Sequence, residues 1–264
     1  MMKYFKEADI KFINFMVDYI DTECPIKRRS KYNTFYYISN IYYVLKTGIS
    51  WNALIAESHY TTIYKKFIYW NTNKVFDNIY NNLVENYIQD NIIKNAYIDA
   101  SHIKNVGGND CIGKNHYDRF RNSTKLHLLI DQNRIPLIFE LTKGNVNDNK
   151  LTEKLSSKLI NINRDKRRSI NLVGDKGYTN YKLAEKLKQD NIYLYTPLKK
   201  NNKKIINKKK YTRKYNSFNR ISIENVFCRL DKFKRIYCRY DKLVSNFKAF
   251  HSIAFSFIIY NFKI

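Results

Sequence analysis

The stretch Ala96-Tyr97-Ile98-Asp99-Ala100-Ser101 marks a change in the residue pattern of this 264-residue chain. Before it, apolar residues recur every three or four positions, as they do in helices. From it onward, short apolar runs rich in branched and aromatic residues are separated by polar turns. Such runs cover residues 96–103, 125–131 and 136–141. Three consecutive β-strands are therefore predicted.

The rest of the chain alternates between helical and strand-like patterns. The expected elements are, in order, a helix at 149–162, a strand at 170–174, a helix at 181–189, a strand at 192–198, and helices at 218–236 and 247–262. The order β-β-β-α-β-α-β-α predicts an α/β domain with a mixed sheet over residues 94–264.

The first 93 residues predict an all-α domain. Apolar positions repeat with helical spacing at 10–20 and 35–45, and Gly48 suits the end of a helix. A third helix, beginning at Thr61 or Thr62, carries Lys65 and Lys66 on its polar side. This helix is the recognition element of a helix-turn-helix-like unit, or it belongs to a helical bundle with a solvated lysine face.

The charge of the chain indicates a polyanionic partner. Lys and Arg number 48 against 23 Asp and Glu, for a formal charge of +25, so DNA is the expected partner. Binding to a membrane surface is the competing hypothesis, but residues 1–5 contain neither a basic amphipathic helix nor a lipidation signal. No apolar run reaches about 18 residues, so no transmembrane helix is expected. A cytoplasmic, nucleoid-associated protein is predicted.

Three carboxylates are candidates for the chemistry. Asp99 lies within the first strand, where an uncompensated charge is costly. Asp175 follows the strand at 170–174, at the carboxyl end where α/β sheets bind ligands. A right-handed crossover would make these two strands parallel neighbours and bring Asp99 beside Asp175. Glu224, on the helix at 218–236, could then cover the pair.

Converging carboxylates would repel each other without cations. Hard divalent ions accept oxygen ligands, and two ions about 3.5–4 Å apart stabilise both oxygens of an in-line phosphoryl displacement. The pattern thus favours metal-dependent phosphodiester chemistry on DNA. The alternative for each residue alone is a salt bridge or a cap at the end of a strand.

The motifs around these residues resemble bacterial insertion-sequence transposases of family five and its relatives. The matching segments are Tyr97-Ile98-Asp99-Ala100-Ser101, Thr124-Lys125-Leu126-His127, Gly144 with Val146-Asn147-Asp148, Gly174-Asp175-Lys176-Gly177-Tyr178, and Arg220 with Glu224. The resemblance implies an RNase H-like core and a DDE active site formed by Asp99, Asp175 and Glu224. It also implies Mg²⁺ or Mn²⁺ as cofactor, two ions per site, and cutting at terminal inverted repeats followed by transfer of the 3′-hydroxyl to target DNA. Two ends must be held together, so a dimer on DNA is expected.

Basic residues are the candidates for contact with DNA. Arg220 precedes Glu224 by four positions, so it forms an ordinary ion pair on the helix or binds a phosphate. Lys125 and His127 share one face of the second strand, where they approach DNA or only line the surface of the sheet; Lys125 is expected to contact DNA and His127 to be structural. The lysine-rich segment 199–210 is expected to contact the DNA backbone through Lys203, Lys204, Lys208 and Lys209. Asp148 is expected to cap the helix that follows it.

The chain departs from the family pattern near Glu224. Relatives commonly have a tyrosine three residues before the arginine and a lysine seven residues after the glutamate, where this chain has Ser217 and Asp231. Lys232 and Lys234 are the nearby substitutes. Two alternatives to a transposase stay open: an endonuclease of the same fold without strand transfer, and a decayed or domesticated DNA-binding protein.

Overall fold

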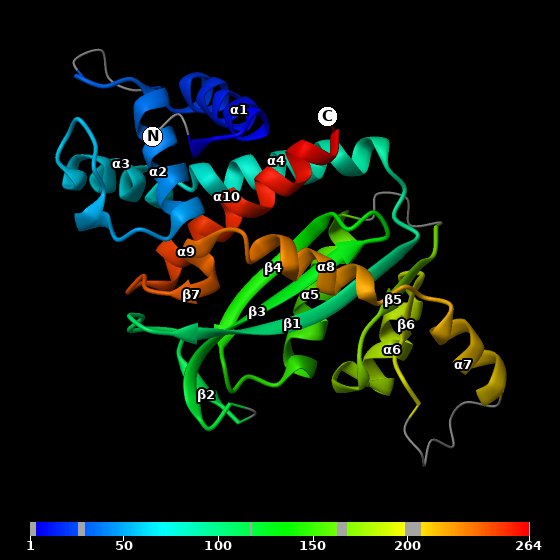
Figure 1. The fold of residues 1–264 in the computed structure, drawn as a ribbon. Helices are drawn as coiled ribbons and strands as arrows, with labels where there is room; N and C mark the ends of the chain where they lie inside the picture. The colour runs from blue at the N-terminus through cyan, green and yellow to red at the C-terminus, as the bar shows by residue number, and fades with distance from the viewer. Residues whose placement is uncertain (1–3, 26–29, 117, 163–167, 199–206, 264) are drawn as a thin grey trace. The chain divides into compact units, whose positions relative to one another are not determined.

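The computed structural model describes residues 4–25, 30–116, 118–162, 168–198 and 207–263 (Figure 1). The chain divides into two compact units. Unit 1 takes in residues 1–87, 103–110 and 229–264, and unit 2 takes in residues 88–102 and 111–228. The predicted boundary after residue 93 thus lies near the end of the continuous N-terminal helical segment, and unit 1 also includes the C-terminal part of the chain.

A mixed sheet forms the centre of unit 2. Its strands are β1 (Asn95–Asn105), β2 (Gly113–Asn115), β3 (Arg121–Asp131), β4 (Pro136–Lys143), β5 (Ile170–Val173) and β6 (Ile192–Tyr195). The order is β2-β3-β1-β5-β6, with β4 antiparallel to β3, and β5 pairs in parallel with both β1 and β6. The five predicted strands are therefore confirmed in an RNase H-like arrangement. The three-residue β2 was not predicted, and β3 begins four residues earlier than expected because Arg121 and its neighbours pair with β2.

Four helices accompany the sheet: α5 (Asp148–Ile162), α6 (Tyr181–Lys188), α7 (Lys208–Asn216) and α8 (Ile221–Leu230). In α5, Leu151, Leu155 and Leu159 recur every fourth position and are buried. This stripe is what the helical periodicity predicted, because residues four apart lie on one face of a helix.

The predicted single helix at 218–236 is wrong. The chain forms α8, a turn at residues 231–233, and the short α9 (Lys234–Tyr237). In the turn, the backbone N–H of Phe233 donates to the carbonyl of Leu230 at 2.8 Å. An unbroken helix would turn Ile236 away from the buried stripe of Ile223 and Val226. Phe233 and Ile236 are both buried.

Unit 1 is built from helices whose core is aromatic. They are α1 (Glu7–Glu23), α2 (Thr34–Thr47), the 3₁₀ turn η2 (Trp51–Ala53), α3 (Tyr60–Thr72), α4 (Val75–Asp90) and α10 (Val244–Lys263). The ring of Phe12 in α1 meets that of Phe257 in α10 edge-on, with centroids 5.5 Å apart. The two ends of the chain therefore share one core. The last residues of β1 also belong here, since Lys104 and Asn105 pair with β7 (Cys238–Arg239).

Gly48 ends α2 as predicted. Its φ of 71° lies in the left-handed region, which glycine adopts without strain. A Cβ at this position would also come within 3.0 Å of Lys234 Cβ. Among the described residues, no helix combines the length and the apolar character needed to span a membrane.

Candidate active site

Asp99 and Asp175 lie on the same side of the β1–β5 strand pair in unit 2, towards the carboxyl end of β5. β1 and β5 are parallel neighbours with Tyr97 opposite Val173, and each aspartate lies two residues beyond that pair. Asp99 Oδ1 accepts the N–H of Ala100 at 2.8 Å, and Asp175 Oδ1 accepts the N–H of Gly177 at 2.7 Å. The crossover argument from the sequence placed both residues correctly on neighbouring parallel strands.

Gly174 allows the chain to turn sharply after β5. A Cβ at this position would lie 3.0 Å from Tyr178 Cβ and 3.1 Å from Ile98 Cγ2, closer than most Cβ contacts. The absence of a side chain lets Tyr178 pack against the start of the turn. The short 3₁₀ helix η3 (Lys176–Tyr178) then begins directly after Asp175.

The surroundings of Asp99 disfavour its negative charge. Burial raises the pKa of Asp99 above its usual range, and the charges of Asp175 and Asp148 raise it further. The N–H of Ala100 and the charge of Arg220 act in the opposite direction. The two neighbouring carboxylates thus disfavour the charged form of Asp99.

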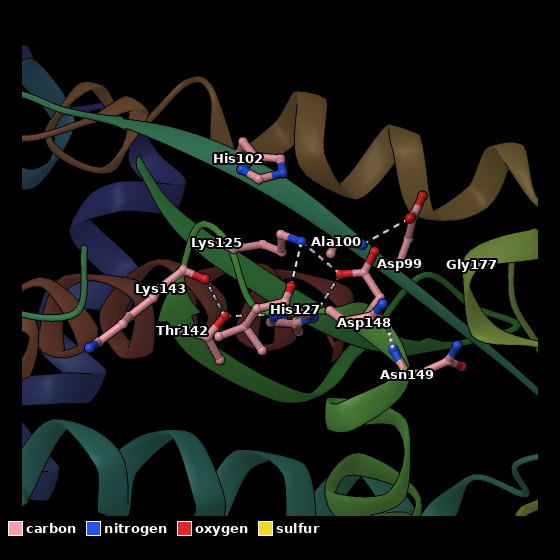
Figure 2. Close-up of polar contacts among 12 residues, drawn as sticks. Asp99, Ala100, His102, Lys125, His127, Thr142, Lys143, Asp148, Asn149 and Gly177 are labelled. Atoms are coloured by element: carbon pink, nitrogen blue, oxygen red, sulfur yellow. Dashed lines mark hydrogen bonds and ion pairs between the residues drawn. The ribbon is translucent and has the colours of Figure 1, made fainter. Parts of the chain in front are cut away.

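Asp148 is a third carboxylate in this neighbourhood (Figure 2). Its Oδ1 accepts a hydrogen bond from Lys125 Nζ at 3.0 Å, and the same ammonium donates to the carbonyl of Val146 at 2.9 Å. The expected cap of α5 is provided instead by Asn147, whose Oδ1 accepts the N–H of Asn149 at 3.0 Å. The side chain of Asp148 is thus directed to other partners.

Lys125 does not lie where we expected a lysine that touches DNA. It is only 6% exposed, and its ammonium is bonded inside unit 2 to Asp148 and Val146. A phosphate could reach this ammonium only if those bonds broke. The prediction that Lys125 contacts DNA rested on its position on the same face of the strand as His127. The alternation of side chains along a strand gives the face of a residue but not the group that its side chain contacts.

His127 is fully buried, in line with the structural role expected for it. Its Nε2 lies 2.9 Å from Thr142 Oγ1, and its Nδ1 lies 3.8 Å from Asp148 Oδ1 without a hydrogen-bond partner. Burial lowers the pKa of His127 to about 4, although the charge of Asp148 opposes this shift. The imidazole is therefore neutral near pH 7.

Tyr178 brings an unpartnered hydroxyl to the same place. The residue is 1% exposed, and its hydroxyl forms no hydrogen bond with any residue that the structure describes. Burial raises the pKa of Tyr178, and the charges of Asp148, Asp99 and Asp175 raise it further. The phenol therefore lies in the field of all three aspartates. The sequence motif around Asp175 contains Tyr178, but the motif gives no sign that its hydroxyl faces the site.

Glu224 is exposed in the first turn of α8. Its helix buries Ile223 and Val226. Within the described ranges, no three His, Cys, Asp or Glu side chains lie close enough together to hold one metal ion. The structure thus brings Asp99, Asp148 and Asp175 into one electrostatic neighbourhood and leaves Glu224 at the surface of its helix.

Arg220 is directed towards Tyr215. Its Nη1 donates to the Tyr215 hydroxyl at 3.2 Å, and that hydroxyl donates to the carbonyl of Gly174 at 3.4 Å. The guanidinium also lowers the pKa of Asp99 by its charge. In the part of the chain that the structure describes, no ion pair joins Arg220 to Glu224. The Tyr215 hydroxyl therefore links Arg220 to the backbone of Gly174, the residue before Asp175.

The other predicted DNA-binding residues differ in exposure. Lys65 is exposed on α3, whereas Lys66 lies over the rings of Tyr69 and Trp70, at 4.9 and 5.0 Å, and its pKa is lowered by burial. The remaining exposed lysines are Lys208 and Lys209 on α7, Lys232, and Lys234, whose Nζ donates to the carbonyl of Asp231 at 2.9 Å. Lys203 and Lys204 lie outside the described residues.

Comparison with known proteins gives results of three kinds. Residues 96–262 match a family described as the transposase DDE domain. No curated protein matches the chain. A cryo-EM structure of the piggyBac transposase synaptic complex with hairpin DNA has a similar fold, with 13% identity, coverage of 96% of this chain and 73% of that chain, and a TM-score of 0.58. The catalytic domain of Mos1 mariner transposase has 13% identity, with coverage of 61% and 89% and a TM-score of 0.28, which is too low to support an argument.

Proposed function

Because this chain belongs to the transposase DDE domain family, we propose that its active site uses Asp99, Asp175 and Glu224 as the three carboxylates of that family. The enzyme is a transposase, which cleaves DNA phosphodiester bonds at the ends of a mobile element and transfers the freed 3′-hydroxyl to target DNA. The likeness to insertion-sequence family five remains a resemblance.

The pairing of β1 with β5 is the observation that supports this assignment most strongly. It brings Asp99 and Asp175 to the same end of two neighbouring strands, and burial together with the nearby charge of Asp175 raises the pKa of Asp99. These side chains offer only hard oxygen donors, which suit Mg²⁺ or Mn²⁺. The unpartnered hydroxyl of Tyr178 is a further group that a hydrated cation would satisfy.

The proposed cofactor is two divalent ions per site. When bound, such ions stabilise the attacking and leaving oxygens of an in-line displacement. Asp99 and Asp175 hold them from the sheet, and Glu224 completes the set from α8 when DNA is present. Arg220, next to Gly174 through the Tyr215 hydroxyl, binds a phosphate of the strand that is cut.

DNA contacts outside the carboxylate site are assigned to exposed cations. We place base reading on the N-terminal helices, with Lys65 on α3, and contacts with the DNA backbone on Lys208 and Lys209 of α7. A dimer that holds both ends of the element is the proposed assembly. Because its substrate is DNA, the proposed location of the enzyme is the nucleoid.

The test uses the purified protein with labelled DNA that carries the repeats flanking its reading frame, together with a supercoiled target. With Mg²⁺ or Mn²⁺, we expect both cut ends and products joined to the target. Cutting without joining would identify an endonuclease of the same fold. Binding without either reaction would identify a DNA-binding protein that has lost catalysis.

A further inference from the structure

We propose that Asp148 supports the divalent-cation site as an outer carboxylate that acts through the water of the ion, held in place by Lys125 and with its second oxygen on the side of Asp175. This inference rests on the proposed function, because it assumes a cation between Asp99 and Asp175. It adds a residue that lies outside the three-carboxylate set and comes from the start of α5.

The two oxygens of Asp148 have different environments. Oδ1 accepts from Lys125 Nζ at 3.0 Å, whereas Oδ2 accepts no hydrogen bond from the described residues. Oδ2 lies 3.8 Å from the point where a side chain at Gly177 would begin, and Asp175 Oδ1 lies 2.9 Å from the same point. The open oxygen of Asp148 is therefore on the side of Asp175. Figure 2 shows the carboxylate between the Lys125 ammonium and Asp99.

The surroundings of Asp148 restrict its position. Lys125 is buried and anchored by the carbonyl of Val146, so the ammonium cannot follow a moving carboxylate without losing that bond. On the same side, His127 is fully buried with Nδ1 3.8 Å from Oδ1. Lys125 therefore offsets part of the negative charge of Asp148 at Oδ1 and leaves Oδ2 for another partner.

Near the carboxylates, two buried polar atoms have no hydrogen-bond partner among the described residues, and they are an observation independent of the carboxylates. The Tyr178 hydroxyl has the charges of Asp148, Asp99 and Asp175 around it and forms no hydrogen bond. His127 Nδ1 is likewise without a hydrogen-bond partner. Buried polar groups are normally satisfied by protein or by ordered water. A hydrated cation at the carboxylates would supply water to the phenol and a charge to Oδ2.

The alternative is that Asp148 serves only as the counter-ion of a buried lysine. In that case Asp148→Asn costs stability, because Lys125 keeps its charge without a charged partner, and cation binding is unchanged. The double variant Lys125→Met with Asp148→Asn removes both charges together. It separates the two roles because it leaves no unpaired ammonium in the fold.

The experiment measures the Mn²⁺ concentration for half-maximal thermal stabilisation of the DNA-free protein and, separately, for half-maximal cleavage. Asp148→Asn and the double variant are each expected to raise this Mn²⁺ concentration by at least about tenfold. An effect of this size is usual when a group that supports a metal ligand is lost. DNA binding in chelator should not change. Glu140→Gln is the matched control, because Glu140 is also a partly buried carboxylate paired with lysines, Lys154 and Lys158.

The outcomes separate this inference from the proposed function. If either Asp148 variant is stabilised at the Mn²⁺ concentrations of the wild type, while Asp99→Asn is not, Asp148 is only a structural counter-ion. If Glu140→Gln needs as much Mn²⁺ as the Asp148 variants, the effect is one of total charge and the inference also fails. If the wild type neither responds to Mn²⁺ nor cuts DNA, the proposed function itself is wrong.

Discussion

Asp99 and Asp175 each lie two residues beyond Tyr97 and Val173, which are directly opposite in the parallel pair β1 and β5. Asp99 continues β1, whereas Asp175 lies just past the end of β5, where its side chain caps η3. Burial and, to a smaller extent, the charge of Asp175 raise the pKa of Asp99.

Substitution of the three carboxylates tests the catalytic assignment. Asp99→Asn, Asp175→Asn and Glu224→Gln are each expected to lower cleavage by more than about 100-fold, since losing even an outer partner of a metal ligand costs 10–100-fold. Binding to the repeats, measured in chelator, should stay within about twofold because no lysine is removed. Efficient Mg²⁺-dependent cutting by one of these variants would remove that residue from the site.

The stability of the protein without metal gives an independent measure. Clustered carboxylates repel one another, so Asp175→Asn is expected to melt in chelator at the temperature of the wild type or higher. Mg²⁺ should stabilise the wild type by mass action and the variant much less. Thermal melts of both proteins with chelator and with Mg²⁺, at fixed ionic strength, make this comparison. A variant that melts lower in chelator and gains as much from Mg²⁺ would show that Asp175 is structural.

Lys65 and Lys66, although adjacent, are expected to behave differently. Lys65 is exposed, so Lys65→Gln should lower the slope of log affinity against log salt by about 0.9 if the residue meets a phosphate, with an unchanged melting temperature. Lys66 packs over aromatic rings, so Lys66→Gln should cost about 1 kcal/mol of stability and leave the slope unchanged. Salt-dependent DNA binding and thermal melts of both variants distinguish the roles. A reversal of the two results would contradict them.

Lys208 and Lys209 test contact with the DNA backbone by α7. Replacing both by Gln should weaken binding to repeat and unrelated DNA by the same factor, and lower the salt slope by about 2, since each lost phosphate contact removes about 0.9. The matched control is Lys11→Gln, on α1, where the lysine is also exposed but paired with Glu7. An unchanged slope would leave α7 without a role in binding.

The acid sensitivity of unit 1 should depend on His251. Burial lowers the pKa of His251 to about 4 in the folded protein, below the value of about 6.5 in an unfolded chain. A histidine with a lowered pKa contributes stability that is present above pH 6.5 and is lost as the pH falls towards 4. At about 1.4 kcal/mol per pH unit, the loss is on the order of 3 kcal/mol.

His251→Gln removes this titration. The difference in free energy of unfolding between wild type and variant is expected to shrink as the pH is lowered from 7 to 4. Denaturant titrations at several pH values measure it. A difference that stays constant over this range would mean that His251 can be charged within the fold.

Local properties explain what could be predicted from the sequence. The five longer strands, the helix α5 and the stop at Gly48 depend on periodicity and on single residues, and these elements were predicted, whereas the short β2 and β7 were not. The parallel neighbours β1 and β5 followed from the handedness of crossovers. Because Asp99 lies in β1 and Asp175 lies just past the end of β5, their closeness was predictable as well.

The sequence by itself thus determined the succession of strands and helices along the chain, the adjacency of Asp99 and Asp175 and the resemblance to a transposase. Only the tertiary structure decided that Lys125 is buried against Asp148, that Lys66 covers aromatic rings and that the helix after Glu224 breaks. Each of these outcomes depends on a partner distant in sequence or on which side chains are buried together. Periodicity shows which face of an element is apolar, but the partner of a polar group on that face depends on how the elements pack.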